Sequence, residues 1–261
     1  MEVTPNTFLP IDLLPLVLTQ LAYDRKLPDL ASCCLVNSTW LHYALPLLYR
    51  RLWFRDQHRV RPVFRSLASN PKLARLVKVL DLRVYPLGLK AEELERLEQD
   101  VARAFDEMVE LESLTWARTG SLNDRLVPHL VRNKPRLSHL ELTGNTRYWS
   151  SSLEMLWSRD NLPALSSLAF ILPDSGAMQA VVSVAAQRKL NSLNLLCQWS
   201  GVVLPVHADL LANNLSDLER LILVGCKRID GTSIKKLVQG SNAGIRTLAL
   251  EGCGVVSRAS R

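Results

Sequence analysis

Histidine and cysteine are the residue types of this chain best suited to chemistry, and neither is spaced for it. The histidines are scattered, at His42, His58, His129, His139 and His207. The cysteines, an odd number without zinc-like spacing, are Cys33, Cys34, Cys197, Cys226 and Cys253. The sequence contains no G-x-S-x-G, no H-E-x-x-H, no phosphate-binding loop and no dinucleotide motif. We therefore expect a protein that is not an enzyme and that binds no metal and no cofactor.

Composition indicates a globular chain with ample apolar material for a core. Of its 261 residues, 48% are hydrophobic and 22% are charged. The first residues lack the basic start of a signal peptide, and the best candidate for a membrane span, residues 13–21, is too short to cross a bilayer and contains Pro15. We expect a reduced, intracellular protein of the cytoplasm or nucleus, or both.

The net charge of +7 is concentrated in one segment, residues 50–78. This segment carries nine basic residues against one acidic residue, Asp56. Such a run can bind the phosphate backbone of a nucleic acid. It can equally be the solvated face of a basic helix that links two domains, and we favour that interpretation. Nucleic-acid binding is kept as a third hypothesis of function.

A leucine-containing phrase recurs through most of the chain. Residues 218–226 read L-x-x-L-x-L-x-x-C, and the phrase returns at 245–253 and, with Asn145 in the last place, at 137–145. In all it can be followed from Val77, Leu111, Leu137, Leu165, Leu190, Leu218 and Ile245. The steps of 25 to 34 residues are typical of a solenoid repeat. The phrase resembles the leucine-rich repeat, in its cysteine-containing subtype.

The resemblance implies a curved solenoid with a parallel sheet inside and helices outside. The alternation of side chains along each strand then turns the leucines inward and the residues between them outward, onto the concave face. On this face we expect a protein substrate to contact Asp81, Arg83, Thr115, His139, Glu141, Asn194, Arg220 and Glu251. Cys226 and Cys253 are interpreted as buried side chains at the strand ends. Because only residues 252–261 remain after the last expected strand, a C-terminal cap is expected to be missing, so that the chain is either a fragment of a longer one or covers this edge by self-association.

The N-terminal segment has a different pattern. Leu14, Val17, Leu18 and Leu21 fall on one face of a helix, with Asp12 before it as the N-cap and Pro15 in its first turn. Two more short helices are expected before residue 54. The segment resembles the F-box of fungal proteins, through Leu9-Pro10-x-Asp12-Leu13-Leu14, Leu30, Leu35-Val36, Trp40 and the tail 44–53. The family usually has glutamate where this chain has Asp12.

An F-box docks on the Skp-type adaptor of a cullin–RING ubiquitin ligase, while a second domain captures the substrate. The resemblance therefore implies a substrate-recognition subunit, with the chemistry left to other subunits. The residues that would enter an apolar groove of the adaptor are Leu9, Pro10, Leu13, Leu14, Val17 and Leu18.

The predicted fold is α/β in three parts: a three-helix F-box over 1–55, a basic helical linker over 56–76, and about seven leucine-rich repeats over 77–261. The expected partners are the Skp-type adaptor and an unidentified protein substrate, without a membrane. The alternative to a ligase subunit is a leucine-rich interaction scaffold that joins no ligase.

Overall fold

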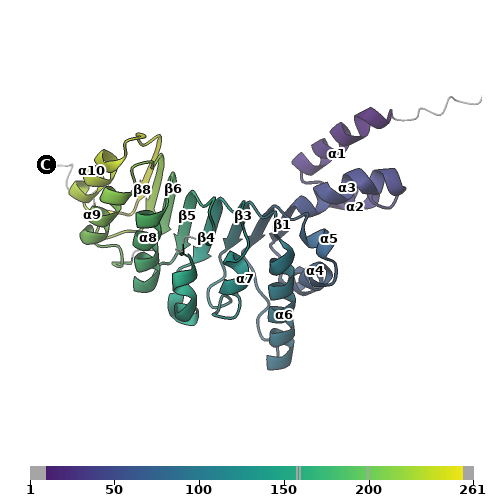
Figure 1. Cartoon of the computed structure of the whole chain (residues 1–261), viewed down its shortest axis with the longest axis horizontal. Coiled ribbons are helices and arrows are strands. Elements are labelled where there is room, and N and C mark those ends of the chain that lie inside the picture. The colour runs from purple at the N-terminus through teal and green to yellow at the C-terminus, as the bar shows by residue number, and fades with distance from the viewer. Residues whose placement is uncertain (1–9, 157, 159, 199, 255–261) are drawn as a thin grey trace, which may run out of the picture. The chain divides into compact units, whose positions relative to one another are not determined.

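The computed structural model describes residues 10–156, 158, 160–198 and 200–254 (Figure 1). The chain forms two compact units, Met1–Leu52 and Trp53–Arg261. Residues 10–50 of the first unit form helices and the turns between them, whereas the second unit combines helices with a sheet. Strand β1 (Arg51–Phe54) spans the boundary between the two units.

The described helices of the first unit are the 3-10 helix η1 (Ile11–Leu13) and the helices α1 (Leu14–Tyr23), α2 (Leu27–Cys33) and α3 (Ser38–Arg50). Its core contains Leu14 and Leu18 of α1, Leu30 of α2 and Ala44 of α3. Helix α3 begins after Asn37, whose side-chain oxygen accepts a hydrogen bond from the backbone N–H of Trp40 at 3.0 Å. Because this core is small, several large apolar side chains of the unit stay exposed.

The second unit is built on a sheet whose strands follow one another in chain order. After β1 these strands are β2 (Val79–Leu82), β3 (Ser113–Trp116), β4 (His139–Thr143), β5 (Ser167–Ile171), β6 (Ser192–Leu196), β7 (Arg220–Val224) and β8 (Thr247–Glu251). From β2 to β8 each strand pairs with the next in parallel. Parallel neighbours need a crossover connection, which explains the helical segments between the strands.

The connecting segments form a row of helices. They are α4 (Gln57–Ser69), α5 (Pro71–Ala74), α6 (Ala91–Glu107), α7 (Val127–Val131), η2 (Thr146–Tyr148), η3 (Ser150–Leu156), α8 (Ser175–Gln187), α9 (Pro205–Asn214) and α10 (Gly231–Gly240). Helix α4 packs on α6, α6 on α7, α8 on α9, and α9 on α10. In Figure 1, α6, α7 and α8 lie on the same side of the strands. The other face of the sheet is therefore the one that presents strand side chains outward.

Register across the sheet aligns equivalent residues in rows. One row contains Leu80, Leu114, Leu140, Leu168, Leu193, Leu221 and Leu248, and the next inward row contains Leu82, Trp116, Leu142, Phe170, Leu195, Leu223 and Leu250. From β2 to β7 both rows are buried, whereas on β8 Leu248 is 46% exposed. Each fully buried leucine contributes about 1.5–3 kcal/mol. These rows are the core that holds the strands together.

A glycine and a cysteine form the turn that leads out of β7 and the turn that leads out of β8. The backbone of Gly225 and Gly252 has φ of +69° and +58°, a conformation that favours glycine. The buried thiols of Cys226 and Cys253 then donate to the carbonyls of Leu195 and Leu223, with sulfur–oxygen distances of 4.0 and 3.4 Å. The thiol of Cys226, which follows β7, therefore bonds to β6, and the thiol of Cys253, which follows β8, bonds to β7.

The architecture predicted from the sequence is wrong. It placed an F-box and a helical linker before a solenoid of seven leucine-rich repeats that begins at Val77. The structure has instead an α/β unit with an eight-stranded sheet that already begins with β1. Residues 56–76 form α4 and α5 of that same unit. The chain is therefore an α/β fold with a sequentially ordered parallel sheet after a separate helical unit, and not an F-box joined to a leucine-rich-repeat solenoid.

An aromatic stack explains why α4 belongs to the sheet unit. Phe64 of α4 is fully buried, and its ring centroid lies 5.4 Å from that of Phe54 in β1 and 6.2 Å from that of Phe105 in α6. Val60 and Leu67 lie on the same helical face and are also buried. The basic residues of α4 occupy the rest of the helix surface.

We predict that Phe64→Ala lowers the free energy of unfolding of the second unit by about 3–5 kcal/mol, because it opens a cavity between α4, β1 and α6. Urea denaturation followed by circular dichroism measures this change. The matched control, Arg65→Ala, alters an exposed neighbour on the same helix and is expected to shift the value by less than about 0.5 kcal/mol. Equal, small effects of both variants would show that α4 is not part of this core.

Candidate functional site

The outward face of the sheet carries a connected set of charged side chains, which we name the strand-face cluster: Arg55, Asp81, Arg83, His139 and Glu141. Asp81 of β2 and Glu141 of β4 lie in one row, with Thr115 of β3 between them. Arg83 follows β2 and bridges the two carboxylates. Its Nε lies 3.0 Å from Asp81 Oδ1, and its Nη1 lies 3.5 Å from Glu141 Oε1.

The cluster extends to both sides of this bridge. Arg55 Nη2 lies 3.5 Å from Asp81 Oδ2. His139 Nε2 lies 4.0 Å from Glu141 Oε2, and its Nδ1 lies 2.9 Å from the hydroxyl oxygen of Ser167 on β5. The side chains of Asp81 and Glu141 are each 15% exposed, whereas that of Arg83 is 39% exposed. The carboxylates are therefore sheltered beneath cations that still reach solvent.

Partial burial shifts two pKa values in this cluster. Burial raises the pKa of Glu141, an effect that the charge of Arg83 opposes and that of Asp81 reinforces. Burial also lowers the pKa of His139 below its ordinary value of 6.5, so its imidazole is neutral at pH 7. The ring then has one donor and one acceptor, which suits hydrogen bonding to a partner better than ion pairing.

The other residues predicted for the substrate face are spread along the sheet. Asn194 continues the row of Asp81, Thr115 and Glu141 through Ala169 of β5. Arg220 lies in the row of His139, but on β7, and Glu251 lies in a further row on the exposed strand β8. The structure thus brings Asp81, Arg83, His139 and Glu141 together, and it leaves Arg220 and Glu251 outside their cluster.

A pocket of about 480 Å³ adjoins the cluster and was missed by the sequence analysis. Its lining residues come from the segments after β1, β2 and β3: Arg55, Asp56, Gln57, His58, Arg83, Val84, Tyr85, Leu87 and Arg118. The sequence assigned Arg55 to the end of an F-box and gave Tyr85 and Arg118 no role. The sequence pattern that could have indicated this pocket is the presence of polar residues directly after successive strands. Parallel α/β sheets place their ligands beyond the carboxyl ends of the strands.

In the first unit, the structure divides the residues predicted to dock on an adaptor. Leu9 lies outside the described residues, Pro10 is exposed, and Leu13 and Val17 are 44% and 41% exposed. The prediction that Leu14 and Leu18 dock on the adaptor is wrong. Both are core residues, 2% and 0% exposed, because this side of α1 packs against α2 and α3.

Two further exposed apolar residues of this segment are absent from the predicted docking set. Ile11 is 57% exposed and Leu16 is 67% exposed. Leu13, Leu16 and Val17 are spaced by three and four residues, so they share a helical face that lies away from Leu14 and Leu18. The helical periodicity was visible in the sequence, but it does not say which of two apolar faces meets the core.

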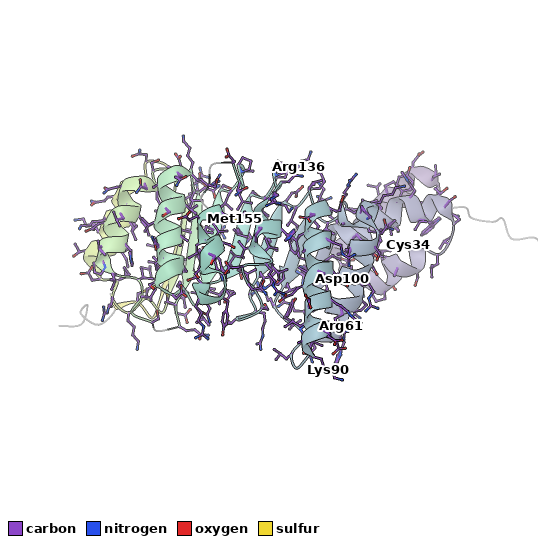
Figure 2. The ribbon with its side chains drawn as sticks, turned by 60° about the horizontal axis from the view of Figure 1, so that its bottom comes forward. Cys34, Arg61, Lys90, Asp100, Arg136 and Met155 are labelled. Atoms are coloured by element: carbon purple, nitrogen blue, oxygen red, sulfur yellow. The ribbon has the colours of Figure 1, made fainter. Side chains whose placement is uncertain are left out.

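Four of the nine basic residues of the basic segment, Arg55, Arg61, Arg75 and Lys78, are paired with acidic neighbours. Arg61 of α4 lies beside α6 (Figure 2), where its Nη1 is 3.2 Å from Glu93 Oε1. Arg75 Nη2 lies 2.9 Å from Glu107 Oε2, and Lys78 Nζ lies 2.8 Å from Glu112 Oε1. Such pairing lowers the positive potential that a nucleic-acid backbone would meet.

Within the described ranges, no group of three or more histidine, cysteine, aspartate or glutamate side chains is arranged to hold a metal ion. The helices in these ranges are also too short or too polar to span a bilayer.

Comparison with known proteins gives weak similarity. No family model matches the chain. The chain is similar to "Antagonist of mitotic exit network protein 1" of Saccharomyces cerevisiae (strain ATCC 204508 / S288c), with 21% identity over 237 residues. That match covers 90% of this chain and 40% of the yeast protein, so the chain spans less than half the length of this relative. These findings show no family, and the resemblance drawn from the sequence stays a prediction.

Among solved structures, the chain is similar to the putative copper homeostasis protein CutC from Streptococcus agalactiae. The sequence identity is 9%, the match covers 78% of this chain and 83% of CutC, and the TM-score is 0.25. A TM-score this low supports no conclusion about function.

The lowered pKa of His139 predicts a pH effect on stability. As the pH falls below about 6.5, the unfolded chain binds the proton before the folded chain does, so the histidine contributes a loss of stability. We expect the free energy of unfolding to fall more between pH 7 and pH 5.5 in the unaltered protein than in His139→Gln. Glu141, with its raised pKa, acts in the opposite direction in both proteins. Equal losses in urea denaturation would contradict this assignment.

Proposed function

We propose that the protein is a non-catalytic substrate-recognition subunit of a Skp–cullin type ubiquitin ligase. In this proposal the helical unit docks on the Skp-type adaptor, and the outward strand face of the second unit binds the protein to be ubiquitinated. The observation that carries the proposal is the exposure of four large apolar side chains, Ile11, Leu13, Leu16 and Val17, within seven residues.

These side chains form a docking segment that the unit does not need for its own folding. The core of Leu14, Leu18, Leu30 and Ala44 is complete without them. Residues 10–23 contain one charged side chain, that of Asp12, so little in the segment favours contact with water. Grouped apolar exposure of this kind is typical of interaction sites. An apolar groove on a helical partner would bury these anchors, in the manner of helix-in-groove recognition.

The strand face of the second unit supports binding of a protein in preference to a polyanion. Its carboxylates alternate with arginines, as in the chain of contacts from Arg55 through Asp81 and Arg83 to Glu141. Such a surface has no field of a single sign. It offers directed hydrogen bonds and ion pairs, which give a protein interface its specificity.

A regulatory role is compatible with the yeast relative, which is named as an antagonist of the mitotic exit network. We propose that the chain itself performs no catalysis and acts in the cytoplasm, in the nucleus, or in both, where it positions a substrate for other subunits. The alternative is an interaction scaffold that belongs to no ligase. Binding of the Skp-type adaptor separates the two.

We predict that Leu16→Ser combined with Val17→Ser weakens binding to a purified Skp-type adaptor by at least about tenfold. The reason is that full burial of such a side chain contributes about 1.5–3 kcal/mol, of which the adaptor supplies the share still exposed in the free unit, and 1.4 kcal/mol corresponds to a factor of ten. Both side chains are exposed in the free unit, so its folding should be unaffected. Surface plasmon resonance gives the dissociation constants.

The matched control is Val206→Ser, which removes an exposed apolar side chain, 53% exposed, from α9 of the second unit. We expect this control to bind the adaptor as the unaltered protein does. Unchanged binding by the double variant would refute the docking segment. Absence of adaptor binding by the unaltered protein would favour the scaffold.

A further inference from the structure

Three cysteine thiols lie near one another where the strands β6, β7 and β8 end. Cys197 directly follows β6, whereas Cys226 and Cys253 lie two residues beyond β7 and β8. All three are free thiols, and all three are buried. The order of the sheet places β7 between β6 and β8, so the three turns are neighbours. None of these cysteines belongs to the strand-face cluster or to the docking segment, so their chemistry is independent of the proposed function.

The sulfur atoms of Cys197 and Cys226 are close enough to be joined. They lie 3.2 Å apart, and a disulfide bond would bring them to about 2.05 Å. The backbone N–H of Cys197 donates to the carbonyl of Val224 at 2.7 Å, so the spacing of the sheet extends to this residue. Neighbouring strands lie about 4.8 Å apart, and a disulfide bridges Cα atoms about 4.4–6.8 Å apart. The sheet itself therefore sets a separation that a disulfide can bridge.

The thiol of Cys253 is bonded in a different way. It donates to the backbone carbonyls of Leu223 at 3.4 Å and of Glu251 at 3.7 Å. The contacts of Cys226 with backbone carbonyls are longer, 3.8 and 4.0 Å, and its shortest contact is the one to the sulfur of Cys197. The proton of Cys226 thus points to a sulfur atom, whereas that of Cys253 points to carbonyl oxygens. Cys197 and Cys226 are therefore the pair arranged for reaction.

The hydrogen bond between these two thiols makes them chemically unequal. Donation from Cys226 lowers the pKa of Cys197, an effect that burial opposes. The same bond, and after it burial, raise the pKa of Cys226. Because the thiolate is the nucleophilic form of cysteine, Cys197 is the thiol disposed to attack, and Cys226 is the thiol that holds the proton.

The turn after β6 gives a small oxidant a route to Cys197. The next residue, Gln198, is exposed, and its φ of +43° lies in the left-handed region, which is unfavourable for a residue other than glycine. Opening of this turn relieves that strain, so the turn opens at a lower cost than the strands do. A molecule of nearly the size of water can then reach Cys197 while the sheet stays intact.

We propose that Cys197 and Cys226 form a disulfide site that responds to hydrogen peroxide. The Cys197 thiolate attacks one peroxide oxygen, the O–O bond breaks, and hydroxide leaves, so that Cys197 becomes a sulfenic acid. The sulfur of Cys226 then attacks the sulfur of Cys197, the S–O bond breaks, and the leaving hydroxide takes the Cys226 proton. The hydroxide of the first step takes the proton that Cys197 had released. Two thiols and one peroxide thus give one disulfide and two waters, and the two electrons that the cysteines lose pass to the peroxide.

The disulfide would tie the turn after β6 covalently to the turn after β7. It joins residues that are 29 positions apart, and α9 lies within the loop that it closes. A cross-link of this kind restricts the unfolded chain, so the oxidised protein is expected to be the more stable form. In a reducing compartment such a bond is transient and senses oxidants, because thiols such as glutathione return the pair to the reduced state.

The test treats the full chain with a small molar excess of hydrogen peroxide, alkylates the remaining thiols after denaturation, and digests the protein with trypsin without reductant. Mass spectrometry is expected to show peptide 190–220, which contains Cys197, linked to peptide 221–227, which contains Cys226. The mass of this product equals that of the two peptides less two hydrogen atoms. Dithiothreitol should release both peptides, and the alkylated Cys253 should remain in an unlinked peptide.

Three variants separate the roles of the cysteines. Cys197→Ser and Cys226→Ser should each abolish the link, whereas the matched control Cys253→Ser, one turn further along the sheet, should form it as the unaltered protein does. Cys226→Ser retains the attacking thiol, so its sulfenic acid should persist at Cys197 and be trapped by dimedone. Cys197→Ser should give little dimedone adduct at Cys226. Oxidation should raise the melting temperature of the unaltered protein by several degrees and leave that of Cys197→Ser unchanged.

Two results would overturn the inference. One is an unaltered protein in which Cys197 and Cys226 both remain alkylated after a treatment that fully oxidises glutathione. The other is a disulfide that joins Cys33, Cys34 or Cys253 in place of this pair. Adaptor binding is measured separately on the reduced protein, so its absence would count against the proposed function alone and would leave the disulfide site unaffected.

Discussion

The parallel hydrogen-bond ladder from β2 to β8 is the constraint on which the second unit depends. It holds equivalent residues of successive strands opposite one another, as with Leu114, Leu140 and Leu168. Because side chains alternate along a strand, the same register that buries the leucines must present the row of Asp81, Thr115 and Glu141 on the other face. Packing and site geometry therefore have one cause, and a shift of one residue in any strand would expose its leucines.

This dependence explains which features could be predicted from the sequence. The recurrent phrase locates β2 to β8, because each strand lies within one copy of it, and its leucines are those that the structure buries from β2 to β7. The phrase could not reveal β1, since Arg51-Leu52-Trp53-Phe54 does not contain it. It also could not show that Phe64 stacks between Phe54 and Phe105, because that contact joins distant segments. The predicted division into F-box, linker and solenoid failed for this reason.

The candidate sites show the same limit. The rows of strand residues followed from period-two alternation, but the bridge from Asp81 through Arg83 to Glu141 depends on how a long side chain crosses a neighbouring strand. The pocket joins Arg55, Arg83 and Arg118, which follow three different strands, and only the order of those strands in the sheet brings the three residues together. In the first unit, helical periodicity could not separate Leu14 and Leu18, which form the core, from Leu16 and Val17, which are exposed.

The central claim is a division of labour, in which the helical unit docks on an adaptor while the strand face stays free for a substrate. Hydrogen–deuterium exchange of the full chain, with and without a purified Skp-type adaptor, tests it directly. The account predicts slower exchange over residues 10–23, with unchanged exchange in the strands β2 to β7 and in residues 83–89. Slower exchange over the strand face, or no change in residues 10–23 at saturating adaptor, would contradict it.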